Sequence, residues 1–127
     1  IRYLLPPSNN YHQVGLITTM STQEMMFIRA EALYRLNRRA EAAALINPTR
    51  LASNLPAVDV NGPPPGRACV PKRDDGSCGD LFDAIQYEKR IELFPTEAII
   101  AFADARGWGK LLPGTPMHFP VHGRELE

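Results

Sequence analysis

The sequence predicts an all-α domain, and three features of its 127 residues support this prediction. Apolar residues recur at three- and four-residue steps over several stretches, which is the spacing of one helix face. Residues that can cap or end a helix stand at the boundaries of these stretches. The segments between them are rich in Pro, Gly, Asn and Asp, as is typical of turns and loops. We therefore expect antiparallel helix pairs connected by long irregular loops.

The first helix is expected over residues 21–36. Ser21 and Glu24 fit a capping box, in which the Ser oxygen accepts one backbone N–H and the Glu reaches back to another. One apolar stripe runs along this helix: Met25, Ile28, Ala32 and Leu36. Phe27 and Tyr34 add apolar surface on another side, so a small domain is not expected to cover the whole of this helix.

The second helix is expected over residues 38–51, after a tight turn at Asn37. It is rich in alanine, and small side chains let two helix axes come close, as in an antiparallel helix pair. Pro48 has no amide hydrogen and its ring crowds the preceding turn. We expect it to kink or break the helix, with a last turn through Leu51.

The longest helical pattern covers residues 80–93, and a further helix is expected over residues 96–106. Asp80 suits the N-cap of the first of these helices. Pro95 ends that helix, because it pushes the residue before it out of helical geometry. Gly107 follows the second helix as a C-terminal glycine. One face of the longer helix carries a nearly apolar set: Leu81, Ala84, Ile85, Glu88, Ile91 and Glu92.

The two carboxylates in this set, Glu88 and Glu92, have two interpretations. They either lie at the exposed edge of the stripe as ordinary helix formers, or they are buried and paired. An unpaired buried carboxylate is too costly to keep charged. Arg50 and Arg106 are the partners we expect in the buried case, since Arg can bind a carboxylate through two parallel hydrogen bonds. The role of these ion pairs would be structural.

Cys69 and Cys78 lie in a long loop, residues 54–78, that is rich in Pro, Gly and Asp. They are either two free thiols or a disulfide, and we favour the disulfide. Such a bond would place the protein in an oxidising compartment. A zinc site is not expected, because two Cys and three scattered His do not supply the usual ligand pairs.

No catalytic centre, metal site or cofactor is expected. Gly-rich phosphate loops, GxSxG and HExxH do not occur in the sequence. His118 and His122 are four residues apart but straddle Pro120, so they do not share a helix face. The formal net charge of zero argues against a nucleic-acid partner, for which a basic patch is the usual footprint. No apolar run is long enough to span a membrane.

Several short stretches stand in one order along residues 18–127. They are Glu24–Ala32, then Ile46-Asn47 followed by Arg50, Tyr87–Leu93, Asp104–Arg106, and finally Phe119–Val121 with Glu125-Leu126. In their order and spacing they resemble the C-terminal part of the SusD/RagB family. Within this region, the unit from Ala30 to Ile46 also resembles a single tetratricopeptide repeat.

The SusD/RagB resemblance implies a non-catalytic lipoprotein on the outer membrane of a bacterium. Members of the family capture glycans or other nutrients at the cell surface and cover a TonB-dependent transporter. Residues 1–127 would then form one helical domain, the C-terminal fragment of a longer chain, with the signal and the lipid anchor in its missing N-terminal part. The apolar surface of the first helix is expected to contact that missing part. A tetratricopeptide-like scaffold that binds a protein segment is the alternative function.

The resemblance does not identify ligand contacts, because no family motif marks them. Tyr87 and Trp108 are the candidates, since exposed aromatic rings can stack on sugar rings, and the loop over residues 54–78 could contribute as well. Trp108 stands beside a helix-ending glycine, where packing within the domain is the competing interpretation.

Overall fold

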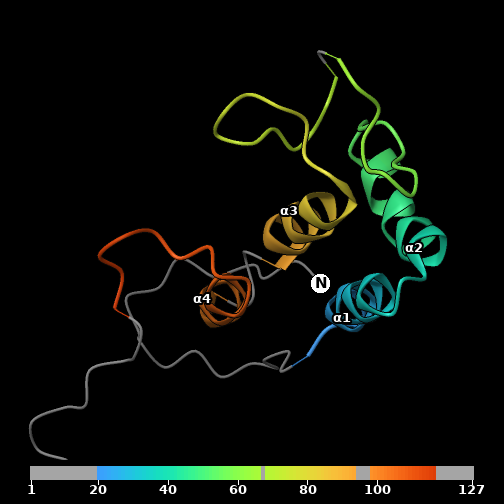
Figure 1. Cartoon of the computed structure of the whole chain (residues 1–127). Coiled ribbons are helices and arrows are strands. Elements are labelled where there is room, and N and C mark those ends of the chain that lie inside the picture. Colours follow the sequence, from blue (N-terminus) through green and yellow to red (C-terminus); the bar gives the residue numbers. More distant parts are fainter. Residues whose placement is uncertain (1–19, 67, 94–97, 117–127) are drawn as a thin grey trace, which may run out of the picture.

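The computed structural model describes residues 20–66, 68–93 and 98–116, which contain four helices (Figure 1). These are α1 (Thr22–Arg35), α2 (Arg39–Ala52), α3 (Leu81–Leu93) and α4 (Ala98–Gly107). Each helix begins and ends within two residues of its expected bounds. The described residues include no strand, only an isolated antiparallel bridge between Lys72 and Cys78. The prediction of an all-α fold is therefore confirmed.

The first three helices form the core, and α4 lies at its edge (Figure 1). α1 and α2 pack together as the expected antiparallel pair, and α3 contacts both of them. Among the described helices, α4 contacts only α3. The buried apolar core is drawn from the first three helices and the loop after α2: Phe27, Ala30, Leu33, Ala42, Ala43, Ile46, Val58, Leu81, Ala84 and Ile85.

α1 turns a different face to the core from the one that its apolar residues suggest. Phe27 is completely buried and Tyr34 is half-buried, stacking on Phe82 with ring centroids 4.9 Å apart. Part of the apolar surface of α1 is uncovered, as expected, but it does not lie on the side of Phe27 and Tyr34. The exposed face is instead the stripe of Met25, Ile28, Ala32 and Leu36. Because both faces of α1 are apolar, periodicity could not decide between them, and burial of the large Phe27 ring gains more than burial of Met25 or Ala32.

The start of α1 and the turn after it follow the local sequence. The Ser21 Oγ accepts the backbone N–H of Glu24 at 3.0 Å, which is the Ser half of the expected capping box. Asn37 has a positive φ of 59°, a conformation that Asn tolerates better than most residues. This turn lets the chain reverse within three residues, from Leu36 to Arg38, and brings α2 back along α1.

α2 continues through Pro48 without the expected break. Proline removes one helical hydrogen bond, but Pro48 points to solvent, where water can bond the freed carbonyl. The residues on either side also anchor the helix. Asn47 donates its Nδ2 to the Val58 carbonyl at 3.0 Å and accepts the Val58 N–H at 2.8 Å, and both Ile46 and Arg50 are completely buried. Tertiary contacts thus outweigh the local cost of the proline.

The long segment between α2 and α3 folds back on the start of α3. The Asn61 carbonyl accepts the N–H of Leu81 at 3.1 Å. Gly62 follows with a φ of 129°, and a Cβ at this position would lie 2.7 Å from the Asp80 carbonyl carbon. Only glycine fits here, because both the backbone conformation and the close approach exclude a side chain. This contact joins the loop directly to the start of α3.

Candidate ligand cleft

The second face of α3 lines a cleft of about 820 Å³. Asp83, Gln86, Tyr87 and Arg90 all contribute to it. They stand three, four and seven residues apart, so they share a helix face that is separate from the core face of Leu81, Ala84, Ile85 and Glu88. α3 therefore forms the floor of the cleft with one face and packs in the core with the other.

Two segments that are far apart in the sequence form the walls of the cleft. One wall is the loop before α3, with Pro71, Lys72, Arg73, Asp74 and Asp75. The other is the end of α4 and the segment that follows it, with Ala105, Trp108, Lys110, Leu111, Leu112 and Pro113. Both segments can be followed in Figure 1, the first in yellow-green before α3 and the second in red-orange after α4. The cleft thus exists only because α3 brings these two loops together.

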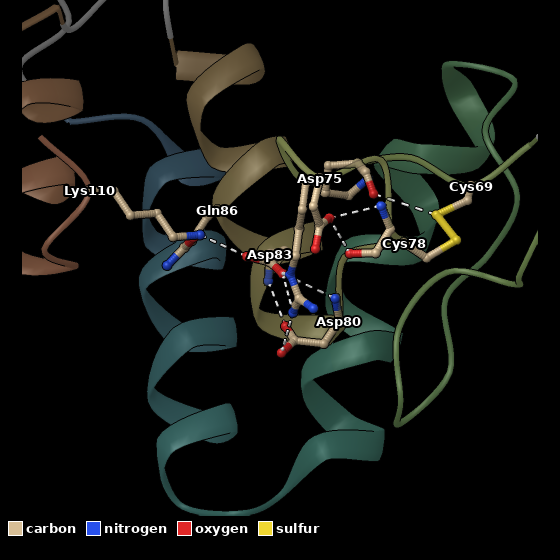
Figure 2. Close-up of polar contacts among 10 residues, drawn as sticks. Cys69, Asp75, Cys78, Asp80, Asp83, Gln86 and Lys110 are labelled. Carbon is tan, nitrogen blue, oxygen red and sulfur yellow. Dashed lines mark hydrogen bonds and ion pairs between the residues drawn. A yellow bond between two sulfur atoms is a disulfide. The ribbon is translucent and has the colours of Figure 1, made fainter. Parts of the chain in front are cut away.

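Asp83 connects the two walls through its carboxylate. Its Oδ1 accepts a hydrogen bond from Lys110 Nζ at 2.7 Å, which Figure 2 shows reaching across the floor. Its Oδ2 lies 2.7 Å from Arg73 Nη2 in the opposite wall, and the same nitrogen is 3.1 Å from Asp80. Burial raises the pKa of Asp83, but hydrogen bonds from Lys110, the Asp80 backbone and Arg73 outweigh it and hold the pKa below its usual value. The carboxylate therefore stays charged, and its ion pairs with Lys110 and Arg73 connect the two walls.

Gln86 is buried in the floor and is only half satisfied. Its Oε1 accepts a hydrogen bond from Lys110 Nζ at 2.6 Å, and the side chain is 4 % exposed. Its Nε2 has no hydrogen-bond partner among the described residues. A buried donor without an acceptor costs roughly 1–3 kcal/mol, so such groups are uncommon in folded proteins and often belong to a site.

The structure joins Cys69 and Cys78, with their Cα atoms 5.8 Å apart (Figure 2). The bond closes the loop that carries the first wall. Within this loop the Asp75 carboxylate accepts hydrogen bonds from the Ser77 N–H at 2.9 Å and the Ser77 hydroxyl at 2.6 Å. The disulfide and this turn stabilise a wall that itself contains no helix or strand, and the bonds of Arg73 to Asp83 and of Arg50 to Val70 attach it to α3 and α2.

We expect no alkylation of Cys69 or Cys78 in the unreduced protein, because a disulfide leaves no thiol to react. Intact-mass measurement after treatment with an alkylating reagent under non-reducing, denaturing conditions tests this. Reduction before the same treatment is the control and should add two alkyl groups. Two adducts without reductant would contradict the bond.

The structure places both aromatic candidates in the cleft, in different settings. Tyr87 is half-buried on the floor. Trp108 is half-buried in the wall, where its Nε1 donates to Glu31 Oε1 at 3.1 Å and Lys89 Nζ lies 5.6 Å from the centre of its ring. Trp108 therefore packs the segment after α4 onto α1 and α3 while it also lines the cleft.

Glu88 and Arg50 form a buried ion pair behind the cleft. Arg50 Nη1 donates to Glu88 Oε1 at 2.7 Å, and their side chains are 0 % and 2 % exposed. Burial raises the pKa of Glu88, and Arg50 opposes this effect. Arg50 also donates to the carbonyl of Pro56 at 3.0 Å and to that of Val70 at 2.8 Å. Arg50 therefore fastens α2 to α3 and to the long loop at two points.

The expectation for Glu92 is wrong. Glu92 is half-buried rather than buried, and its carboxylate accepts a hydrogen bond from Gln23 Nε2 at 3.0 Å. Arg106 is exposed in the last turn of α4. Ile91, expected on the same buried stripe, is 55 % exposed. In this last turn of α3 the buried residue is Leu93, 4 % exposed, so Ile91 and Glu92 lie to the side of the core face.

The buried cation that faces α4 is instead Lys89. Its Nζ lies 2.7 Å from Asp104 Oδ2, and the Lys89 side chain is only 5 % exposed. Sequence reasoning missed this pair, although Lys89 stands one residue after Glu88 and Asp104 belongs to one of the stretches that carry the family resemblance. The pair attaches α4 to α3 and so positions the wall that contains Trp108.

Sequence reasoning also missed most of the floor and walls, namely Asp83, Gln86, Arg90, Arg73 and Lys110. A signal for the floor existed. Its members on α3 stand at i, i+3, i+4 and i+7, which is a complete helix face, but their polarity is also typical of a solvent-exposed surface. The lysine and arginine of the walls have no pattern in the sequence, because they reach the floor only through tertiary structure.

The other candidate sites among the described residues are less suited to bind a ligand than the cleft over α3. A smaller hollow of about 360 Å³ lies at the turn between α1 and α2, beside Arg38, which already pairs with Glu41. Among the described residues no group of three or more His, Cys, Asp or Glu side chains could hold a metal ion. His118 and His122 lie outside the described residues. No helix in the described part of the chain is long and apolar enough to cross a bilayer.

Comparisons with protein-family models, with curated proteins and with solved structures give no match to this chain.

Proposed function

We propose that this chain binds a glycan or another nutrient in the cleft over α3 and does not transform it. The observation that supports the proposal is the composition of the cleft. An aromatic ring, Tyr87, lies on a floor that also carries Asp83, Gln86 and Arg90, and the apolar side chain of Leu112 is 78 % exposed at the wall. Sugars have apolar C–H faces and many hydroxyl groups, so a site that mixes aromatic, apolar and hydrogen-bonding side chains suits them.

The contacts in the cleft favour binding over catalysis. A general acid or base needs a carboxyl that is free to exchange a proton with the substrate. Asp83 is the most enclosed carboxylate of the cleft, and it is held by Lys110 and Arg73 with a lowered pKa. Asp75 is engaged with Ser77. These groups are therefore better suited to hold the walls together than to transfer protons.

The resemblance to SusD/RagB proteins extends this proposal to a cellular setting. The chain would be the C-terminal part of a lipoprotein on the bacterial surface, and it would deliver its ligand to a TonB-dependent transporter in the outer membrane. The stretches that carry the resemblance include buried structural residues of the described core, among them Ala30, Ile46, Arg50 and Glu88. A TonB-dependent transporter encoded next to this chain would support the setting.

The binding proposal is tested by titrating the chain with oligosaccharides, after a glycan array has identified which of them it retains. Tyr87→Ala should weaken binding by roughly fivefold or more, because loss of a central aromatic contact typically costs over 1 kcal/mol. Leu36→Ala is the matched control, since Leu36 is 69 % exposed on α1, away from the cleft. Failure of every glycan to bind, or equal effects of the two substitutions, would contradict the proposal.

The alternative function is a scaffold that binds a protein segment, and it is supported by an exposed apolar stripe on α1. Met25 is 54 % and Ile28 is 44 % exposed on a helix of the antiparallel pair, and apolar patches on a surface often mark contact sites. A tetratricopeptide-like scaffold would bind a protein segment there. In that case Ile28→Glu should abolish capture of the partner and leave glycan binding unchanged, whereas Tyr87→Ala should have the opposite effect.

A further inference from the structure

The polar groups of the cleft that remain unpaired are mainly hydrogen-bond donors. Gln86 Nε2 is buried and has no acceptor among the described residues. Arg90 and Lys72 line the same cleft, are exposed, and form no ion pair with any described residue. The cleft therefore has more donors than its own acceptors can satisfy.

The carboxylates of the cleft do not offset this excess. Asp83 already accepts from Lys110 and Arg73, and Asp75 accepts from Ser77. Asp74 and Asp75 both lie in the exposed turn of the loop, and neither forms an ion pair with a described residue. Over the whole lining, four cations (Lys72, Arg73, Arg90 and Lys110) stand against three carboxylates (Asp74, Asp75 and Asp83), so the cleft carries one net positive charge and favours a ligand that brings acceptors and a negative charge.

The arrangement of Tyr87 and Arg90 indicates where that charge would lie. They are three residues apart on the cleft face of α3, a spacing that puts side chains beside each other with Cβ atoms roughly 5–6 Å apart. A sugar ring has a similar width. A ring stacked on Tyr87 therefore presents a group on its edge to Arg90, whose planar guanidinium can hold a carboxylate through two parallel hydrogen bonds.

We propose that the cleft selects acidic glycans, with the carboxylate of a uronic acid bound by Arg90 and its ring packed on Tyr87. Lys72 adds long-range attraction from the wall. Lys110 can supply a further donor, since its side chain is 49 % exposed and its ammonium uses only two of its three N–H groups, on Asp83 and Gln86. This inference rests on the proposed function, because it names the class of sugar that the same cleft would take.

The test compares ligands that differ only in charge. The chain is titrated with trigalacturonate and with trimannuronate, each alongside its fully methyl-esterified form, and with neutral maltotriose and cellotriose. We expect at least one acid to bind about tenfold more tightly than its ester, since the ester keeps the ring but loses the charged acceptor. This preference should shrink at high salt, because the Arg90 site is exposed and therefore screened.

Variants then assign the preference to its residues. Arg90→Gln should bring the acid and the ester to about equal affinity and leave neutral binding in place, whereas Tyr87→Ala should weaken all sugars. Arg29→Gln is the matched control, since Arg29 is an exposed arginine of α1 that does not line the cleft. Circular dichroism checks that each variant is folded. Arg90→Gln and Arg29→Gln are expected to fold normally, because both arginines are exposed.

The outcomes separate the two proposals. Neutral sugars that bind as tightly as both acids would overturn the selection of acidic glycans and leave glycan binding standing. An acid preference that survives Arg90→Gln, or that falls equally with Arg29→Gln, would overturn the assignment to Arg90. If neither these sugars nor any glycan on the array binds, both this inference and the proposed function are overturned.

Discussion

Glu88→Ala is expected to destabilise the fold by about 3–5 kcal/mol, because it leaves the guanidinium of Arg50 buried without its counter-ion. Arg50→Ala should cost at least as much. It strands not only the Glu88 carboxylate but also the carbonyls of Pro56 and Val70, to which Arg50 donates. Denaturant unfolding of the two single variants and of the double variant measures these losses and the coupling between the partners.

The exposed pair of Arg38 and Glu41 is the matched control. Both of its side chains are more than half exposed, so Glu41→Ala should change the free energy of unfolding by less than about 0.5 kcal/mol. The expectation for Glu88 fails if its loss falls in the same small range. In that case the carboxylate would be solvated, and α2 and α3 would be held together by their apolar contacts alone.

Phe27→Ala should destabilise the domain by about 3–5 kcal/mol, whereas Ile28→Ala should cost less than about 1 kcal/mol. Phe27 is completely buried at the centre of the core, and the adjacent Ile28 is 44 % exposed. The contrast between two neighbouring apolar residues tests which face of α1 meets the other helices. Thermal or denaturant unfolding of the two variants measures it.

The opposite order of effects would show that the stripe of Met25 and Ile28 is the buried one. It would also remove the exposed apolar surface on which the scaffold function depends. Equal and small losses would indicate that α1 contributes little to the core, which is incompatible with its packing against both α2 and α3.

The position of each helix could be predicted because the signals for it are local. Ser21 caps α1 through the next turn of its own backbone, and Asn37 adopts its positive φ within the turn it forms. The core face of α3 was also readable for Leu81, Ala84, Ile85 and Glu88, since only one face of its first three turns is apolar. A buried carboxylate with an arginine partner follows from the same periodicity and from the cost of burying a lone charge.

Where tertiary contacts oppose a local signal, the sequence was not sufficient to predict the structure. Pro48 favours a break in α2, but the bonds of Asn47 to Val58 and the burial of Ile46 and Arg50 keep the helix continuous. Glu92 shares the periodicity of Glu88 but lies in the last turn of α3, where it meets Gln23 rather than an arginine. These outcomes depend on contacts between segments that are far apart in the sequence, which periodicity does not describe.

The sequence by itself determined the all-α fold and the bounds of the four helices, and it named burial beside an arginine as one of two possible places for Glu88. Each of these depends on spacing along the chain or on a single strong energetic constraint. Only the tertiary structure decided the outward stripe of α1 and the cleft over the second face of α3. The reason is that Arg73 and Lys110, which lie 37 residues apart, converge on Asp83 only after the disulfide-closed loop and the segment after α4 have folded against α3.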